Sequence, residues 1–488
     1  MSAWDDLLRS ERDRFVDDLV RAGFRPDANN AYTLTNEVEI PALNKVVEIR
    51  VTIPDSFPFV PPRVKPTAGD GTSSWHRERD NTLCLWAAES EPSQPWTSVE
   101  FLVARVCDWF LQDQNGWIND SPNLDLERYW MPLGENVLFL HDGLTDSHGF
   151  CFDVHPARVS KGTASIYRVQ RRWQPTMRRK RGHEKALVIN IGELSTPPRE
   201  FDHLLDRVAE QNGQTSADEV DRIVRGSVDW LLVRYERNGN PGVLALAVVN
   251  RKPLLLNCVE AAEDSDRVRN LRRGTRTDQL AVCKVAIVGV GAVGSFLADQ
   301  LTRSGIPHLT LIDHDLLRPG NLPRHLAGSK HIGQPKVHAV ADQLREDGLL
   351  DITTLETRES RLDPCAAELL LTEHDLVIDA TANATITRAL AAAAQLTGRS
   401  FLSICVQHDG ATTRLDRYPI SPSEQHSPPT EAPPGGLHPP GYEGGCGDPI
   451  SPTPPYSCIS AASLASSAAA SILTGLQIPP TIVQHVLV

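Results

Sequence analysis

A short glycine-rich segment constrains this chain more than any other part of its sequence. The stretch KVAIVGVGAVGSFLADQL, residues 284–301, predicts a buried strand, a loop and a helix, with Gly289, Gly291 and Gly294 in GxGxxG spacing. Such glycines let backbone amides approach a phosphate at a helix N-terminus, where the helix dipole favours negative charge. A second apolar run, LTLID, ends in Asp313, where a ribose-binding acid is expected. The segment therefore predicts a nucleotide-binding α/β fold.

The polar residues that follow distinguish between classes of nucleotide-binding protein. A nicotinamide or flavin enzyme would satisfy the glycine pattern equally well. Downstream, however, the sequence supplies Asp315, Asn321, Arg324 and Lys336 within HDLLRPGNLPRHLAG and IGQPK. A dehydrogenase does not need these cations, whereas attack of a carboxylate on the α-phosphate of ATP builds negative charge that fixed cations stabilise. Arg324 and Lys336 therefore favour an adenylation site over a redox site.

The whole pattern, from GxGxxG through DxD and N-L-x-R-H to G-x-x-K, resembles the ThiF/MoeB and ubiquitin-activating adenylation family over about residues 265–488. The resemblance implies a Rossmann-like domain that uses ATP and Mg²⁺, with Asp313 on the ribose. It also implies phosphate contacts from a set of three polar side chains, namely Asn321, Arg324 and Lys336.

One element departs from this family pattern. The D-x-x-D-N element appears here as DATAN, residues 379–383, so Ala382 stands where the family has its second acid. That acid is the one usually linked to magnesium, and Asp379 becomes the candidate metal ligand.

The N-terminal region contains a cysteine whose role the local sequence leaves open. Apolar residues at helical spacing and then the alternation KVVEIRVTI, residues 45–53, predict a helix followed by strands. The prolines of DSFPFVPPRV cannot donate to a sheet, so this segment is expected to run extended across a surface. A further helix is predicted in SVEFLVARVCDWFL, with Ser98 as its N-cap. Between them, NTLCLW sets Cys84 between two leucines, which by itself indicates a buried structural residue.

The order of helix, strands, proline-rich strap, histidine, LCLW and helix resembles the ubiquitin-conjugating (UBC) fold over residues 45–112. The resemblance implies that Cys84 is a catalytic, acyl-accepting cysteine and that His76 belongs to its loop. Arginine and glutamate follow His76, so the asparagine that steadies the oxyanion in the family is not in its usual place, and Asn81 is a possible substitute. We expect an exposed thiol with an ordinary pKa of about 8.5, reacting without a dedicated base.

The middle region, residues 146–270, gives no chemical signal. Its basic run, Arg168–Lys185, is typical of a solvated face or linker. The runs WLLVRYE and VLALAVV flank Asn238–Gly242 and predict a β-hairpin. We assign this region as an α/β linker of unknown role.

A second cysteine is expected to carry the acyl group between the adenylate and Cys84. The segment Ser421–Ser457 is dense in proline and glycine and predicts a crossover loop. Cys446 lies between glycines in this loop, in a setting that resembles the cysteine loop of bacterial activating-type fusions. Cys458 is the rival, because its place before an alanine-rich helix resembles the P-x-x-C element of ThiF. Direct transfer to Cys84 is the third alternative.

Composition limits the partners and the compartment. The 488 residues carry a net charge of −13, which argues against nucleic-acid binding. Nine scattered cysteines without a CxxC indicate a reducing compartment. The N-terminus lacks a signal-peptide core, and the alanine-rich run 461–473 is too short to span a membrane. We therefore expect a cytoplasmic protein without membrane association.

Together the two resemblances predict a multidomain chain of mixed α/β and α+β class. Its domains would be a UBC-like α+β domain at 1–145, the linker at 146–270 and a ThiF-type adenylation domain at 271–488. They imply ATP-dependent activation of a protein C-terminus, thioester transfer to Cys84 and ligation to an amine of a target. The fusion resembles bacterial ubiquitin-like systems, including CBASS antiphage operons, so the carrier would be a ubiquitin-like protein or a cyclic-nucleotide synthase. A homodimer is expected from the resemblance to ThiF.

Two other functions stay open from the sequence. One is a sulfur-carrier adenylyltransferase of ThiF/MoeB type with an inactive UBC-like binding module. The other is a Rossmann oxidoreductase whose first domain only binds a partner.

Overall fold

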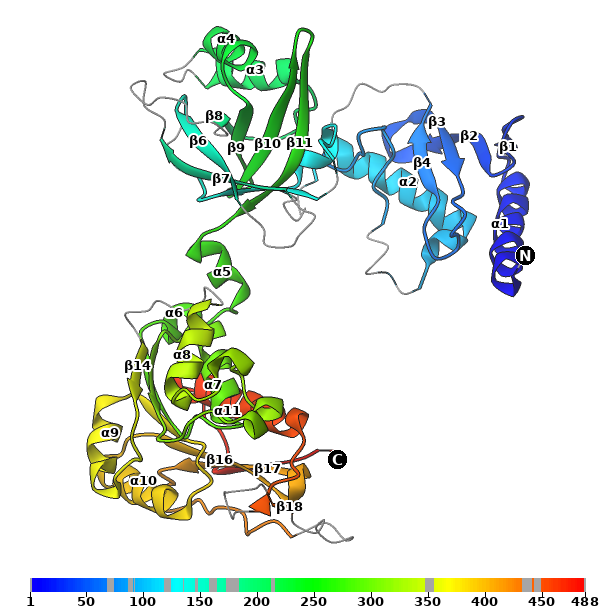
Figure 1. Ribbon diagram of the computed structural model, residues 1–488. Helices are drawn as coiled ribbons and strands as arrows, with labels where there is room; N and C mark the ends of the chain where they lie inside the picture. Colours follow the sequence, from blue (N-terminus) through cyan, green and yellow to red (C-terminus); the bar gives the residue numbers. More distant parts are fainter. Residues whose placement is uncertain are drawn as a thin grey trace. The chain divides into compact units, whose positions relative to one another are not determined.

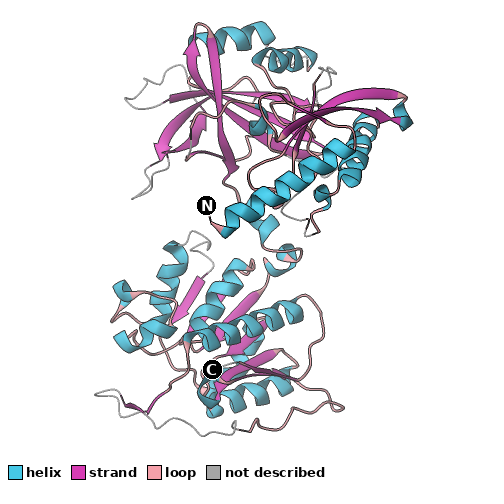
Figure 2. Ribbon diagram, turned by 90° about the vertical axis from the view of Figure 1, so that its right-hand side faces the viewer, coloured by secondary structure: helices cyan, strands magenta, loops and turns pink. Residues whose placement is uncertain are grey.

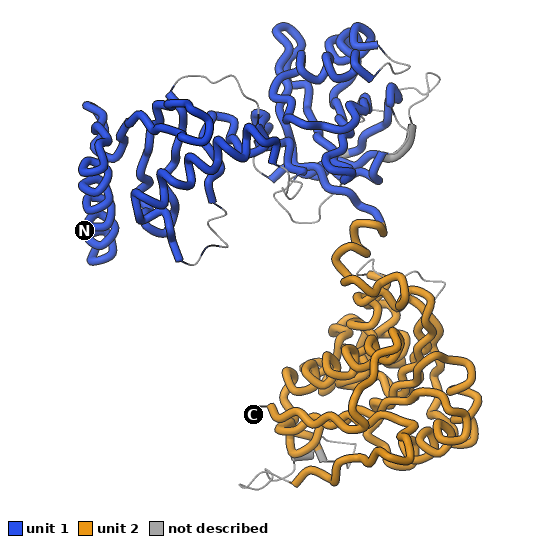
Figure 3. The backbone as a smooth tube through the Cα atoms, turned by 180° about the vertical axis from the view of Figure 1, so that it is seen from behind, with its two compact units in different colours: residues 1–265 blue, residues 266–488 orange. Residues whose placement is uncertain are grey.

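The computed structural model divides into two compact units, residues 1–265 and 266–488 (Figure 3). The first unit contains both the N-terminal region and most of the predicted linker. The structure describes the following residues: 2–67, 74–86, 91, 93–117, 124–134, 136–144, 148–157, 165–172, 184–211, 216–346, 355–431, 441–442 and 449–486.

The N-terminal part of the first unit is an antiparallel sheet with two helices (Figure 1). The sheet has the order β1-β2-β3-β4. Alternation in β3 sends Ile49 and Val51 into a core that also receives Leu102 and Val106 from α2. The Ser98 side chain caps α2, as the sequence predicts. The elements are α1 (Ala3–Arg21), β1 (Arg25–Pro26), β2 (Thr33–Ile40), β3 (Lys45–Thr52), β4 (Arg63–Pro66) and α2 (Val99–Gln114).

The rest of the first unit is a closed barrel rather than the α/β linker that we expected. Its strand order is β10-β11-β5-β7-β6-β8-β9. The predicted hairpin is confirmed: β9 and β10 flank Asn238 and Gly239, which both have positive φ. The barrel begins with β5, before the expected boundary at residue 146. Its elements are β5 (Val137–His141), β6 (Cys151–Ala157), β7 (Ser165–Arg172), β8 (Glu184–Glu193), α3 (Phe201–Glu210), α4 (Ala217–Gly226), β9 (Trp230–Arg237), β10 (Asn240–Arg251) and β11 (Leu254–Glu263).

The second unit is built on a seven-stranded sheet of order β14-β13-β12-β15-β16-β17-β20, in which β17 and β20 are antiparallel to their neighbours. Helices pack on both faces of this sheet, as Figure 2 shows: α7, α8 and α11 on one face, and α9 and α10 on the other. The elements are α5 (Asp266–Arg272), α6 (Thr277–Leu280), β12 (Lys284–Val288), α7 (Gly294–Arg303), β13 (His308–Ile312), α8 (Lys336–Glu346), β14 (Leu355–Arg358), α9 (Ala367–Glu373), β15 (Leu376–Asp379), α10 (Ala384–Thr397), β16 (Phe401–Gln407), β17 (Thr412–Tyr418), β18 (Gly441–Tyr442), β19 (Pro449–Ile450), α11 (Pro455–Leu473) and β20 (Thr481–His485).

Both faces of the central strand β12 are buried, as its unbroken apolar sequence predicts. Val285 and Ile287 join the core formed with α7, α8 and α11. Ala286 and Val288 join a second core formed with α9 and α10. The chain leaves β12 toward β13 on one side and leaves β15 toward β16 on the other, so the connections diverge between β12 and β15 at the carboxyl edge of the sheet. Ligands of doubly wound sheets bind at such a point.

Helix α11 differs from the expectation that its alanine-rich run is too short to span a membrane. It is 19 residues long, and among the described residues it is the one helix that by length and composition could cross a membrane. Its alanines, including Ala461 and Ala465, pack into the core beside α7 and β16. That packing is typical of a core helix.

Candidate active sites

The glycine loop after β12 opens on a cleft of about 220 Å³. Gly289 has a φ of +86°, and a Cβ there would lie 2.9 Å from the Thr381 amide nitrogen. At Gly294 a Cβ would lie 1.9 Å from the Gly289 carbonyl oxygen. Beside Gly291, by contrast, there is open space. The first and third glycines are thus required by the fold, and the second leaves room for a ligand.

Asp313 holds two loops at the edge of this cleft. Its Oδ2 accepts a hydrogen bond from the Val290 amide at 2.8 Å, and its Oδ1 accepts one from the Asp315 amide at 2.8 Å. Val290 lies inside the glycine loop, so the carboxylate fixes the loop against the end of β13. The residue expected to hold a ribose therefore positions the glycine loop.

Lys336 and Asp315 form an ion pair that lines the cleft. The Lys336 Nζ lies 2.9 Å from Asp315 Oδ2, and the lysine side chain is only 12% exposed. Burial alone would raise the pKa of Asp315, but the hydrogen bond and charge of Lys336 outweigh it and hold that pKa below its ordinary value. The cation is thus anchored beside open space rather than extended into solvent.

Asn321 and Arg324 do not line the cleft formed by the described residues. The Asn321 Oδ1 accepts a hydrogen bond from the Arg318 amide. Arg324 donates from Nη1 to the Ser451 carbonyl at 2.9 Å and more weakly to Thr453. The arginine is therefore engaged with the segment that leads into α11.

The proposed metal ligand Asp379 does not fit a magnesium site in this arrangement. Its side chain is 1% exposed. Its oxygens accept hydrogen bonds from the Thr381 amide at 2.9 Å, from the Thr381 hydroxyl at 2.6 Å and from the Thr387 hydroxyl at 2.6 Å. A group that could hold a metal ion lies elsewhere along the cleft. It consists of Asp313, His314 and Asp315, whose ligand atoms lie within 4.8 Å of one another.

Sequence reasoning missed several residues of this cleft. Arg361 lies in it and donates to the His314 ring at 3.0 Å. Thr381 and Thr387 fix Asp379. The sequence signal that could have found Arg361 is its position, because it follows strand β14 at the same edge of the sheet.

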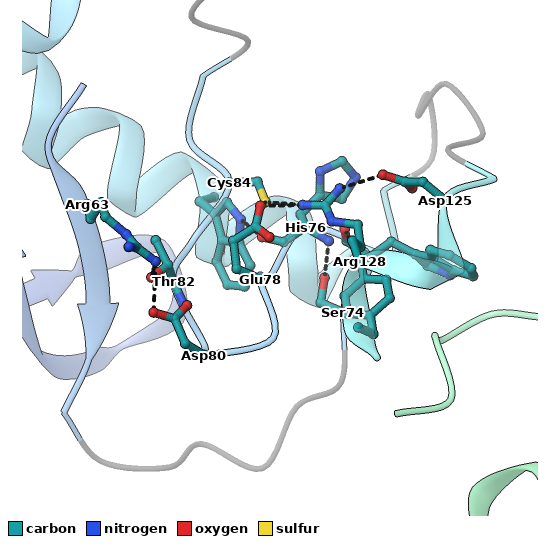
Figure 4. A network of polar contacts seen from close by, with 12 residues as sticks. Arg63, Ser74, His76, Glu78, Asp80, Thr82, Cys84, Asp125 and Arg128 are labelled. Atoms are coloured by element: carbon teal, nitrogen blue, oxygen red, sulfur yellow. Dashed lines mark hydrogen bonds and ion pairs between the residues drawn. The ribbon is translucent and has the colours of Figure 1, made fainter. Parts of the chain in front are cut away.

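Cys84 lies between an acidic and a basic side chain (Figure 4). The thiol donates to Glu78 Oε1 at 3.3 Å, and Arg128 Nη2 donates to the sulfur at 2.9 Å. The same Arg128 nitrogen lies 2.6 Å from Glu78 Oε1, and the arginine also contacts Asp125. Glu78 follows His76 by two positions, but Arg128 lies 44 residues beyond Cys84 and gave no signal in the sequence.

The chemical state of Cys84 differs from the expectation of an exposed thiol with an ordinary pKa. Burial raises the pKa of Cys84 to about 12. Arg128 lowers this pKa and Glu78 raises it, and neither effect is as large as that of burial. At neutral pH the free cysteine is therefore a thiol, and its reaction requires an acceptor for the proton.

His76 supports the loop around Cys84 through its backbone. Its carbonyl accepts hydrogen bonds from the Cys84 amide at 2.9 Å and from Trp109 Nε1 at 3.1 Å. Its ring stacks on Trp117 with a centroid distance of 3.7 Å. Asn81, the possible substitute for the oxyanion asparagine, accepts a hydrogen bond from Arg199 at 3.4 Å.

The structure describes one of the two candidates for the intermediate thiol. Cys446 lies outside the described residues. Cys458 is 2% exposed in the first turn of α11, and burial raises its pKa, with nearby Arg324 acting in the opposite direction. A carrier would reach Cys458 only if this turn opened.

Comparison with known proteins identifies the class of the second unit. Residues 267–470 match the ThiF family, so this unit carries a ThiF family domain.

Three curated relatives share part of the chain. The ATP-dependent ubiquitin transferase-like protein Cap2 of Enterobacter hormaechei subsp. hoffmannii (strain UCI 50) is 29% identical over 149 residues, which are 29% of this chain and 23% of Cap2. The molybdopterin-synthase adenylyltransferase of Escherichia coli (strain K12) is 36% identical over 105 residues, which are 21% of this chain and 41% of that enzyme. The uncharacterized protein y4oA of Sinorhizobium fredii (strain NBRC 101917 / NGR234) is 51% identical over 61 residues, 12% of this chain and 10% of that protein. The chain thus spans less than half the length of each.

Proposed function

We propose that this protein activates the C-terminus of a carrier protein with ATP, transfers it as a thioester to Cys84 and ligates it to an amine of a target protein. Activation would take place in the cleft of the second unit. The observation that carries this part is the anchored Lys336 beside the open space at Gly291, in a domain that matches the ThiF family. The similarity to Cap2 supports a ubiquitin-like carrier, and a cyclic-nucleotide synthase C-terminus is the other candidate.

In the activation step, the carrier carboxylate attacks the α-phosphate of ATP and pyrophosphate leaves. Backbone amides of the glycine loop and the Lys336 ammonium would stabilise the negative charge that grows on the phosphate oxygens. Asp315 keeps the lysine in position. Arg324 would join this site only after leaving the carbonyls of Ser451 and Thr453, so its phosphate contact stays a prediction.

The transfer steps depend on thiols. Cys446 remains the first candidate for the thiol that takes the acyl group from the adenylate, with buried Cys458 as the rival and direct transfer to Cys84 as the third alternative. From either thiol, or from the adenylate itself, the acyl group would pass to Cys84 and then to the target amine. A cytoplasmic homodimer remains the expectation from the sequence.

The second candidate function is sulfur-carrier adenylation with an inactive first unit. The similarity to molybdopterin-synthase adenylyltransferase favours it. The two functions differ at Cys84, because only ligation requires an acyl group on this cysteine.

Carrier-dependent exchange between ATP and pyrophosphate tests the activation step. We expect Lys336→Ala and Arg324→Ala each to slow exchange by about 100- to 1000-fold, the usual cost of losing one transition-state contact. Lys330→Ala is the matched control, because Lys330 pairs with Glu346 away from the cleft and should exchange normally. Exchange at the wild-type rate in both test variants would remove this mechanism.

A further inference from the structure

Arg128 occupies a position at Cys84 that no resemblance in the sequence assigns. It belongs to the 3₁₀ turn Leu126–Tyr129, and its side chain is 20% exposed. Its Nη2 contacts both the Cys84 sulfur and the Glu78 carboxylate, and its Nη1 lies 3.3 Å from Asp125. Its guanidinium carbon also lies 5.4 Å from the centre of the Tyr129 ring. The Arg128 guanidinium is therefore fixed against the Cys84 sulfur by its neighbours Glu78, Asp125 and Tyr129.

Acyl transfer makes two demands on the groups that contact the Cys84 sulfur. The thiol must lose its proton, and the sulfur and the acyl oxygen must carry negative charge in turn. His76 supports the loop through its carbonyl, and the Asn81 Oδ1 accepts a hydrogen bond from Arg199; neither of these contacts reaches the sulfur. Among the side chains that the structure describes around Cys84, Glu78 and Arg128 are the charged pair in direct contact with its sulfur.

We propose that Arg128 and Glu78 are the catalytic pair of Cys84: Glu78 accepts the proton, and Arg128 stabilises the negative charge on sulfur and on the acyl oxygen. This inference rests on the proposed transfer through Cys84. In the UBC family an asparagine steadies the oxyanion, and the inference assigns this role to an arginine from a distant turn.

In the loading step, the thiol proton of Cys84 passes to Glu78 as the sulfur attacks the acyl carbon of the incoming adenylate or thioester. A carbon–sulfur bond forms, and AMP or the donor thiolate leaves. Glu78 then gives its proton to the departing thiolate or, when AMP leaves, to water, and is a carboxylate again. In the ligation step, the target amine attacks the thioester carbon and its proton passes to Glu78. The bond to Cys84 then breaks, and sulfur leaves as a thiolate beside Arg128. Return of the proton from Glu78 to sulfur restores the resting state.

Alkylation of Cys84 tests the pair without any need for carrier, ATP or target. Chloroacetamide modifies the thiolate, so its rate on the Cys84 peptide reports the charge around the sulfur. Arg128→Gln should slow alkylation at pH 8 by about tenfold, which corresponds to about one pKa unit. Glu78→Gln removes a negative charge and should speed alkylation by up to about tenfold. Among the described residues, Tyr129 and Arg199 also interact electrostatically with this thiol.

Arg105→Gln is the matched control for this measurement. Arg105 donates from Nε to the Leu85 carbonyl at 2.7 Å, next to Cys84 in the chain, and the described contacts do not connect it with the sulfur. It should leave the alkylation rate within about twofold of wild type. Equal slowing in Arg128→Gln and Arg105→Gln would show loop distortion and overturn the role of Arg128.

Discharge of a preformed Cys84 thioester to an amine tests the catalytic step itself. We expect Arg128→Gln and Glu78→Gln each to slow discharge by about 100-fold or more. Arg128→Lys should restore part of the rate because it keeps the charge. For Glu78→Gln, faster alkylation together with slower discharge is a combination that a merely structural role does not produce. Discharge at the wild-type rate in both Gln variants would overturn the pair, whereas a wild-type protein that never forms the thioester would overturn the proposed function and leave the alkylation result standing.

Discussion

The carboxylates of the two sites have different partners. In the cleft of the second unit, Asp313 accepts hydrogen bonds from backbone amides, and Asp379 is enclosed by Thr381 and Thr387. At Cys84 in the first unit, the carboxylate of Glu78 contacts the sulfur directly. The first site is thus a frame of fixed loops around open space, whereas the second is a set of reactive side chains already in contact.

This difference determines what each site requires before reaction. Under the proposed function the cleft would gain its chemistry when a nucleotide enters it, and its own charged pair, Lys336 with Asp315, is already formed beforehand. Cys84 already contacts its proposed proton acceptor, Glu78, and the cation of Arg128, and burial raises its pKa so that it is a thiol. Variants of the two sites should therefore separate activation from transfer.

The largest expected effect comes from Cys84→Ala. Without the sulfur, conjugates to the target should disappear completely, while carrier-dependent exchange of ATP and pyrophosphate should remain normal. Gel analysis of conjugates beside the exchange assay measures both. Lys336→Ala should instead reduce exchange and conjugates together, and normal conjugate yield from Cys84→Ala would make this cysteine structural.

The Cys84→Ala variant also identifies the thiol that takes the acyl group from the adenylate. On a non-reducing gel, Cys84→Ala should retain a reductant-sensitive adduct of the carrier, and this adduct should vanish when Cys446 is also replaced. Loss with Cys458→Ala instead would favour the rival, despite its 2% exposure.

A large effect of pH is expected at Cys84. With a pKa of about 12, its thiolate fraction at pH 8 is about three orders of magnitude smaller than that of an ordinary thiol. Since the pKa is raised, the alkylation rate should increase about tenfold per pH unit from neutral pH upward, without levelling off below about pH 11. Peptide mapping after chloroacetamide treatment, with a short cysteine peptide as reference, measures this. A plateau near pH 9 would show an exposed thiol and remove the need for Glu78 as base.

The contrast between the sites also explains what the sequence could and could not predict. The glycine loop, Asp313 and Lys336 belong to local patterns, because strand, turn and helix follow one another in the chain. The β9–β10 hairpin is local in the same sense. The barrel was missed because β5 pairs with β11, more than 100 residues later, and such pairing leaves no mark on local periodicity. Arg128 was missed because it lies 44 residues beyond Cys84, and no local sequence pattern connects the two.

Asp379 and Arg324 show a further limit of motif reasoning. A motif assigns a role to a position, but it does not tell which neighbours engage the side chain there. Thr387 closes over Asp379 from α10, and the Ser451 carbonyl takes Arg324 from the segment before α11. Both partners lie outside the quoted motifs.

The smallest expected effect concerns Arg199, which precedes α3 and holds the Cys84 loop. It donates to the Ser74 carbonyl at 3.3 Å and to Asn81 Oδ1 at 3.4 Å, and it lies over the Tyr129 ring at 5.0 Å. These contacts are long, so Arg199→Ala should lower the free energy of unfolding of the first unit by only about 1 kcal/mol, as measured by denaturant titration. Amide hydrogen exchange of residues 76–84 should rise at the same time, since the loop loses a support.

Arg207→Ala is the matched control for this last prediction, because Arg207 donates to the Glu193 carbonyl within the barrel at 2.6 Å. It should cost a similar free energy of unfolding and leave exchange in residues 76–84 unchanged. If both variants raise exchange there equally, the loop depends on the stability of the whole unit rather than on Arg199. In that case the Cys84 site would share with the nucleotide cleft the property of being fixed mainly by backbone contacts, such as the one between the Cys84 amide and the His76 carbonyl.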